Sequence, residues 1–124
     1  MIYAPICLFV FKRLEETKQT VASLLANAES QFSDLYIFSD AARNLEEDEK
    51  VKSVRDYIKT IYGFKTVTIF EAEQNKGLAN SIIDGVSIII TKRERVIVLE
   101  DDLIVSSNFL AYMNQALDFY INDA

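Results

Sequence analysis

Apolar residues along the chain follow two alternating patterns. Four short apolar runs cover residues 6–11, 35–39, 66–70 and 96–99. The first run is rich in branched and aromatic side chains, which is typical of a strand that is buried on both faces. Between and after these runs, apolar residues recur three and four positions apart, a spacing that predicts four amphipathic helices. The pattern therefore predicts strands and helices that alternate along the whole chain.

Polar residues and glycines indicate where several of these helices begin or end. The helices are expected at about residues 14–27, 44–63, 78–90 and from 107 onward. Asn44, with Glu47 three residues later, is typical of a capping box and predicts the start of the second helix. Gly63 supplies a C-terminal stop for that helix. Ser107 or Asn108 can cap the last helix.

Strands and helices that alternate with short connections predict parallel strands joined by right-handed crossovers. The predicted fold class is α/β, a three-layer αβα domain with a Rossmann-like, mainly parallel sheet. The composition is even, without repeats or linkers, so residues 1–124 are expected to form one domain. In open sheets of this kind, ligands bind outside the carboxyl ends of the strands. The residues that follow each strand are therefore the candidates for chemistry.

Charged residues follow every predicted strand. The fourth strand leads directly into Glu100, Asp101 and Asp102. Like charges this close repel one another, and one pKa would rise unless a cation or hydrogen-bond donors compensate. A divalent cation is the simplest compensation, and oxygen ligands without histidine or thiolate suit Mg²⁺ or Mn²⁺. The alternative interpretation is a solvated acidic loop that leads into the last helix. The other strands are followed by Lys12 and Arg13, by Asp40, and by Glu71, Glu73, Asn75 and Lys76.

The overall composition restricts the partners. Nineteen acidic and thirteen basic residues give a net charge of −6, which offers no basic stripe to a nucleic acid. The chain has no histidine and one cysteine, Cys7, so neither a histidine-ligated zinc nor a disulfide framework is expected. The N-terminus lacks the features of a signal peptide, and the apolar runs are far too short to span a bilayer. A soluble, cytoplasmic protein without a nucleic-acid partner is therefore expected.

Three motifs together carry a resemblance to a known family. The acidic triplet at 100–102 follows a strand and leads into Ser-Asn-Phe-Leu at 107–110. It is preceded by Asn-Lys-Gly-Leu-Ala at 75–79 and by Phe-Ser-Asp at 38–40. This combination resembles the GT-A glycosyltransferases, and among them the N-acetylglucosaminyltransferase I type and its bacterial relatives. The resemblance covers nearly the whole chain, from Pro5 to about Tyr120. In that type, an acidic triplet of this kind plays the part of the Asp-X-Asp metal motif.

The resemblance implies roles for the acidic residues. Asp102 corresponds to the direct ligand of Mn²⁺ or Mg²⁺, and Glu100 and Asp101 to residues that hold the ribose or the water around the metal. Asp40 resembles the acidic residue that recognises the nucleotide base or ribose. The alternative interpretation of Asp40 is a turn-forming residue before two alanines.

The resemblance also implies roles for the basic and amide residues. Arg13 matches the basic residue that contacts the nucleotide or its diphosphate, and its alternative interpretation is a solvated residue at the start of a helix. Asn75, Lys76 and Gly77 precede a helix whose N-terminus can face phosphates, since free amides and the helix dipole favour an anion. The more ordinary interpretation of Gly77 is that it permits the turn.

The resemblance also implies a reaction. The expected function is a metal-dependent glycosyltransferase that transfers a sugar from a nucleoside diphosphate sugar, preferably UDP-linked, to a glycan or other hydroxyl acceptor, with inversion. Enzymes of this family have a second half that binds the acceptor and supplies the catalytic base. The chain is therefore expected to be the nucleotide-sugar-binding, N-terminal part of a longer enzyme and to be nearly inactive alone. The Asp-Ala-Ala sequence at 40–42 departs from the usual Asp-Gly pairing.

Two rival functions are also compatible with acidic residues at the rim of an α/β sheet. A receiver-like signalling domain binds Mg²⁺, but its acidic pair follows the first strand, which here is followed by Lys12 and Arg13. A non-catalytic module that holds a basic partner at the acidic rim would need no metal. A metal-dependent thermal shift separates that module from the transferase.

Overall fold

The computed structural model describes residues 2–123, and all of the predicted strands and helices are present. The strands are β1 (Ile6–Val10), β2 (Asp34–Ser39), β3 (Thr66–Glu71) and β4 (Ile97–Glu100). The helices are α1 (Leu14–Leu25), α2 (Leu45–Ile58), α3 (Leu78–Ile90) and α4 (Phe109–Asp123), with a short 3-10 helix, η1 (Ala28–Phe32), that the sequence pattern did not predict. The alternation of apolar runs and helical spacing therefore identified the elements correctly.

The four strands form one sheet in the order β3-β2-β1-β4, and every neighbouring pair is parallel. Strands β2 and β3 follow one another on one side of β1, and the chain then crosses back so that β4 pairs with the other side of β1. The direction of winding reverses between β1 and β4. In doubly wound sheets this switch point opens a crevice at the carboxyl ends of the two strands. The topology therefore places a crevice where the β1–α1 loop meets the acidic triplet.

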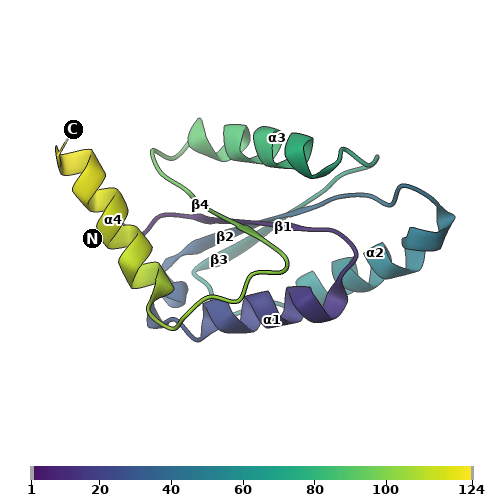
Figure 1. The fold of residues 1–124 in the computed structure, drawn as a ribbon, viewed down its shortest axis with the longest axis horizontal. Helices are drawn as coiled ribbons and strands as arrows, with labels where there is room; N and C mark the ends of the chain where they lie inside the picture. Colours follow the sequence, from purple (N-terminus) through teal and green to yellow (C-terminus); the bar gives the residue numbers. More distant parts are fainter. Residues whose placement is uncertain (1, 124) are drawn as a thin grey trace.

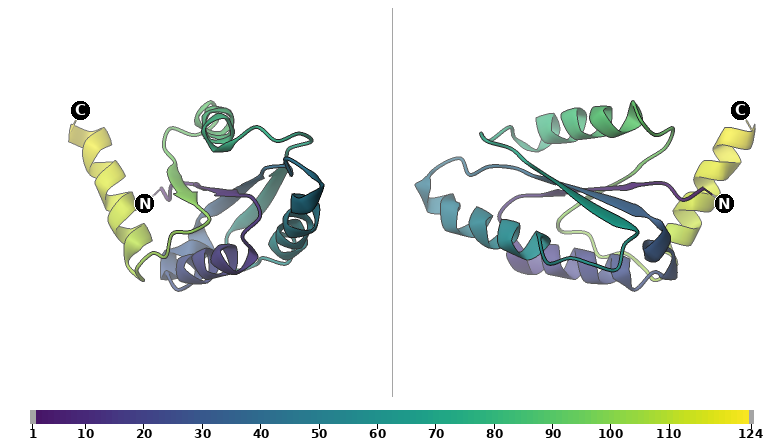
Figure 2. Two further views of the ribbon diagram at one scale, coloured as in Figure 1. Left: turned by 45° about the vertical axis from the view of Figure 1, so that its right-hand side comes forward. Right: turned by 180° about the vertical axis from the view of Figure 1, so that it is seen from behind.

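Two apolar cores hold together the three layers that Figure 1 shows. Helices α1 and α2 cover one face of the sheet, and α3 covers the other (Figure 2). Side chains alternate between the two faces along β1, so that Ile6, Leu8 and Val10 belong to the core under α1 and α2. Cys7 and Phe9 belong to the core under α3. The structure is the three-layer α/β fold with a Rossmann-like parallel sheet that the sequence predicts.

The second helix ends earlier than predicted. Helix α2 stops at Ile58, five residues before Gly63. Gly63 instead has a φ of +106° in the turn that leads to β3, where a side chain would also meet Leu25. The start was predicted correctly, because the Asn44 side chain accepts a hydrogen bond from the Glu47 amide at 3.2 Å.

The last helix is capped from a distant part of the chain. The buried Asn27 side chain accepts a hydrogen bond from the Leu110 amide at 3.0 Å. Its amide nitrogen donates to the Ser106 carbonyl, also at 3.0 Å. Asn108, one of the two predicted caps, has its side-chain oxygen bonded to the Ser106 hydroxyl. Asn27 therefore fixes the segment that connects the acidic triplet to α4.

No helix in the part of the chain that the structure describes is both long and apolar enough to cross a membrane.

Candidate functional site

A cavity of about 440 Å³ lies at the carboxyl ends of the strands. Its walls come from the end of β1 and the loop after it, from the segment after β2, from the turn before α3 and from the end of β4. Its floor is apolar and includes the Phe9 and Phe38 rings, which stack at 5.0 Å between centroids. The volume falls within the usual range for small-molecule sites. The cavity therefore lies where the sheet topology predicts a ligand site.

Most of the predicted site residues meet in this cavity. The lining includes Arg13, Asp40, Asn75, Glu100 and Asp101, which come from four separate segments of the chain. Asp102 is outside the lining but next to it, since its carboxylate lies 3.6 Å from the Arg13 guanidinium. Lys76 does not line this cavity and instead faces a neighbouring one. Five of the seven predicted residues therefore line the cavity, Asp102 lies beside it, and Lys76 faces the neighbouring hollow.

Arg13 connects the first and the fourth strand ends. Its guanidinium donates to the Asp101 carboxylate at 2.9 Å and also approaches Asp102. Asp101 is only 5% exposed, and burial raises the pKa of its carboxyl, an effect that the Arg13 charge partly offsets. The Thr20 hydroxyl fixes the same segment by donating to the Asp101 carbonyl. Arg13 therefore supplies part of the compensating charge that the acidic triplet requires.

Two carboxylates of the triplet keep oxygens available for a cation. Among the described residues, Glu100 has no ion pair or hydrogen bond through its side chain, and Asp102 has only its contact with Arg13. Among the side chains that the structure describes, those of residues 2–120, no three acidic or cysteine side chains converge into a complete metal cage. Magnesium in nucleotide sites typically takes one or two protein carboxylates and completes its shell with water and phosphate. The donor set therefore fits a metal that arrives with a phosphorylated ligand.

Asp40 holds the turn that forms another wall of the cavity. One carboxylate oxygen accepts from the amides of Ala41 and Lys76, each at 2.9 Å. The other accepts from the Gly77 amide at 3.0 Å and from the Asn75 side chain at 3.2 Å. The carboxylate is buried and has four donors from its own chain. Direct contact of Asp40 with a nucleotide stays a prediction, whereas its role in shaping the turn is visible.

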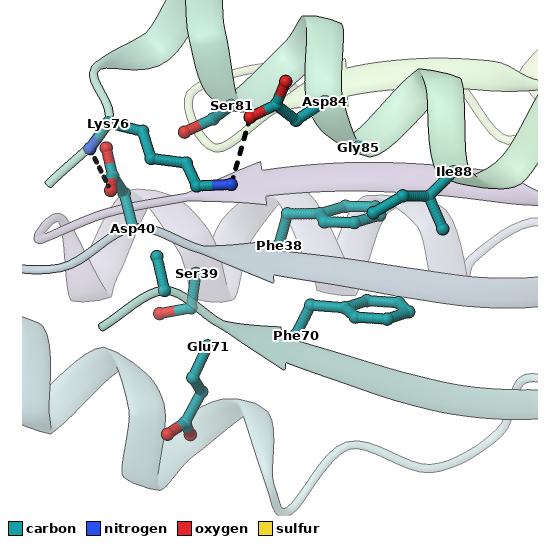
Figure 3. A pocket seen from close by; sticks show the side chains of 11 residues that line it. Phe38, Ser39, Asp40, Phe70, Glu71, Lys76, Ser81, Asp84, Gly85 and Ile88 are labelled. Carbon is teal, nitrogen blue, oxygen red and sulfur yellow. Dashed lines mark hydrogen bonds and ion pairs between the residues drawn. The ribbon is translucent and has the colours of Figure 1, made fainter. Parts of the chain in front are cut away.

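The hydrogen bonds to Asp40 also determine which donors at the start of α3 remain available to a ligand. The amides of Lys76 and Gly77 point to Asp40, so they are already used. Gly77 has a φ of +81°, which supports the simpler interpretation that it permits the turn. The Lys76 side chain runs along α3 to Asp84, with 3.1 Å between its ammonium group and the carboxylate (Figure 3). It crosses a smaller hollow of about 220 Å³, whose floor carries the stacked rings of Phe38 and Phe70.

A basic group on a second wall of the cavity was not predicted from the sequence. Lys12 and Arg43 line the cavity, and both bind the carboxylate of Glu47, the first at 2.6 Å and the second through two nitrogens. Glu47 was assigned to the capping box, and its side chain does bond the Arg43 amide at 2.9 Å. The capping interpretation hid the long-range contact with Lys12. The only signal in the sequence was the position of Lys12 and Arg43 shortly after strand ends.

The contribution of Glu47, Lys12 and Arg43 to stability is expected to depend on pH. Hydrogen bonds from Arg43 and then from Lys12 hold the pKa of its carboxyl well below the usual range. A depressed folded-state pKa stabilises the fold at pH values above the ordinary glutamate pKa, and the contribution is lost as the pH falls below it. We expect the Glu47 carboxyl carbon to show no titration step between pH 5 and about 3.5 in an NMR titration, the range in which a free glutamate side chain titrates. A Glu47 midpoint at the ordinary glutamate value of about 4.3 would contradict the contact.

The sheet order and the cavity define a Rossmann-like α/β fold with a cavity at the switch point of the sheet. The fold is also that of a solved glycosyltransferase. The crystal structure of S. aureus TarS matches 92% of this chain with a TM-score of 0.62 and 13% sequence identity, and the chain spans 19% of the TarS chain. At this identity the similarity concerns the fold. No protein-family model matches the chain. A search of curated proteins also gave no match.

Proposed function

We propose that the chain is the sugar-nucleotide-binding domain of a metal-dependent glycosyltransferase. The glycosyltransferase-like fold supports this proposal, since TarS shares it over most of the chain. The observation that carries the proposal is the Arg13–Asp101 ion pair at the switch point, with Glu100 and Asp102 on either side of it. It places hard oxygen donors and a guanidinium at the position where α/β sheets bind nucleotides.

The charges around the crevice favour a ligand that contains both phosphate and a cation. Glu100, Asp101 and Asp102 outnumber the single Arg13 beside them, so a bare diphosphate would meet net negative charge. A divalent cation changes that balance, because it contributes two positive charges in a small volume. Bound at Asp102, Mn²⁺ or Mg²⁺ would supply positive charge to a diphosphate leaving group. The proposal therefore requires the metal and the nucleotide to bind together.

The residues of the chain have separate tasks in this proposal. Arg13 binds the diphosphate and orients Asp101, while Glu100 and Asp101 hold the ribose or the metal-bound water. Asp40 and Asn75 form the wall against which the base lies. Lys76 reaches a phosphate only if its side chain leaves Asp84, which lies 3.1 Å away. The acceptor, a glycan or another hydroxyl compound, and the base that deprotonates it are proposed to belong to a part of the enzyme outside these residues.

Calorimetric titration with UDP tests the proposal. We expect Mn²⁺ to tighten UDP binding to the unaltered chain at least about ten-fold, because the charge-assisted contacts of a bound metal exceed 1.4 kcal/mol. Asp102→Ala should abolish this gain and leave the fold intact, since the Asp102 side chain is 43% exposed. Asp56→Ala, which removes an exposed carboxylate on α2, is the matched control and should keep the gain.

Two results would count against the proposal. If UDP binds equally well with and without Mn²⁺, the metal has no role at this site. If Mn²⁺ raises the affinity of the Asp102→Ala variant as much as that of the unaltered chain, the metal lies elsewhere. Binding of a basic peptide without any metal, in the absence of UDP binding, would instead favour the non-catalytic binding module.

A further inference from the structure

The cavity has two walls of opposite electrical character. On the wall formed by the end of β4, Glu100 and Asp101 line the cavity with Asp102 next to them, and the Arg13 guanidinium pairs with Asp101 and Asp102. On a second wall, next to the ends of β1 and β2, the two cations Lys12 and Arg43 share the carboxylate of Glu47. One wall therefore carries excess negative charge and the other excess positive charge. An anionic group that enters the cavity without a metal will favour the second wall.

The second wall is held in place before any ligand arrives. The Glu47 carboxylate is 6% exposed and receives four bonds, three of them from Arg43 and one from Lys12. The Phe11 ring lies under both cations, at 5.6 Å from the Lys12 ammonium and 5.6 Å from the Arg43 guanidinium carbon. A guanidinium or ammonium group positioned in this way loses little freedom when it binds an anion.

Donors remain on this wall after the internal contacts are counted. Arg43 uses its Nε and Nη2 nitrogens for Glu47, and among the described side chains of residues 2–120 its Nη1 nitrogen has no partner. Lys12 makes one hydrogen bond through its ammonium group in the same described part, which leaves two of its three N–H groups. A purely structural ion pair requires none of these donors to face a cavity. Both residues nevertheless line it together with Arg13.

We propose that Lys12 and Arg43 form a second phosphate-binding subsite, which holds a phosphate group of the substrate without the metal. The inference rests on the proposed function and deepens it. The substrate is then a phosphorylated compound that spans the cavity, with one phosphate contact at the metal wall and another at the wall of Lys12 and Arg43. Glu47 is a positioning residue, since it contacts the two cations and not the substrate.

Metal-free titration with inorganic pyrophosphate tests the subsite. In EDTA, we expect pyrophosphate and UDP to bind weakly to the unaltered chain, and uridine to show no binding. Arg43→Gln and Lys12→Gln should each weaken pyrophosphate binding about ten-fold, which is the loss expected for one charge-assisted contact. Arg43→Lys should recover only part of the affinity, because the forked donor geometry is lost. Lys52→Gln removes an equal charge from an exposed position on α2 and is the matched control.

The outcomes separate this inference from the proposed function. If pyrophosphate in EDTA binds Arg43→Gln and Lys12→Gln as well as the unaltered chain, or binds none of the three, the second subsite does not exist. Amide spectra of both variants verify that the fold is intact. A loss of affinity with Lys52→Gln as large as that with Arg43→Gln indicates an effect of net charge and also overturns the subsite. The gain in UDP affinity caused by Mn²⁺ is a separate measurement, and its absence would overturn the metal role alone.

Discussion

Replacement of Asp40 by alanine should lower the free energy of unfolding by about 3 kcal/mol or more, because it leaves several hydrogen-bond donors without an acceptor. The Asp40 carboxylate is 8% exposed and accepts from the amides of Ala41, Lys76 and Gly77 and from the side chain of Asn75. Without it, the turn before α3 loses three bonds to the segment after β2 and keeps the bond from the Asn75 side chain to the Ala41 carbonyl. Chemical denaturation measures the loss of stability, and UDP titration measures the accompanying damage to the cavity.

Two comparison variants make the Asp40 result specific. Asp40→Asn should recover little stability, because one side of the amide is a donor and would face donors of the turn. Asp84→Ala removes an exposed carboxylate from the same region and should change stability by less than about 1 kcal/mol. A denaturation midpoint of Asp40→Ala equal to that of Asp84→Ala would show that the four contacts do not hold the turn.

The second large effect is expected at Asn27. Asn27→Leu keeps the number and branching of the side-chain heavy atoms but removes the acceptor of the Leu110 amide and the donor to the carbonyls of Ser23 and Ser106. The side chain is 1% exposed, so these groups become unpaired in a buried position. We expect a loss of about 3 kcal/mol in the free energy of unfolding. Thermal and chemical denaturation of the variant measure it.

The cap predicted from the sequence provides the contrast. Asn108→Ala removes a side chain whose hydrogen bond is to the exposed Ser106 hydroxyl, so we expect a change below about 1 kcal/mol. If Asn108→Ala costs more than Asn27→Leu, the local residue is the true cap of α4. The segment after the acidic triplet would then be fixed by its own sequence and not by α1.

The fold could be predicted because its main signals are local. The apolar run of β1 and the helical spacing of residues such as Val51, Val54 and Ile58 each identify an element without knowledge of its neighbours. The strand order has no such local signal, because it depends on which strand the chain returns to after α3. The end of α2 was misplaced because Gly63 is suited both to a helix stop and to the turn that it occupies.

The site was predictable only in part, for a related reason. Arg13 and Asp101 follow strands β1 and β4, and parallel strands bring such residues to one edge of the sheet. Asn75 and Lys76 are adjacent in sequence, but the bond from the Lys76 amide to Asp40 turns its side chain toward the neighbouring hollow. Contacts such as Lys12 with Glu47 join residues 35 positions apart, and neither motif nor spacing indicates them.

The central claim is that a divalent cation binds at the end of β4 together with a nucleoside diphosphate. Paramagnetic broadening by Mn²⁺ tests it directly, because the effect on amide resonances falls steeply with distance from the ion. With UDP and a small amount of Mn²⁺, the strongest broadening should centre on the amides of Glu100, Asp101 and Asp102 and extend to Arg13. Asp102→Ala should remove this centre. Broadening centred instead on the exposed acidic first turn of α2, at Glu46 and Asp48, would contradict the proposed metal site.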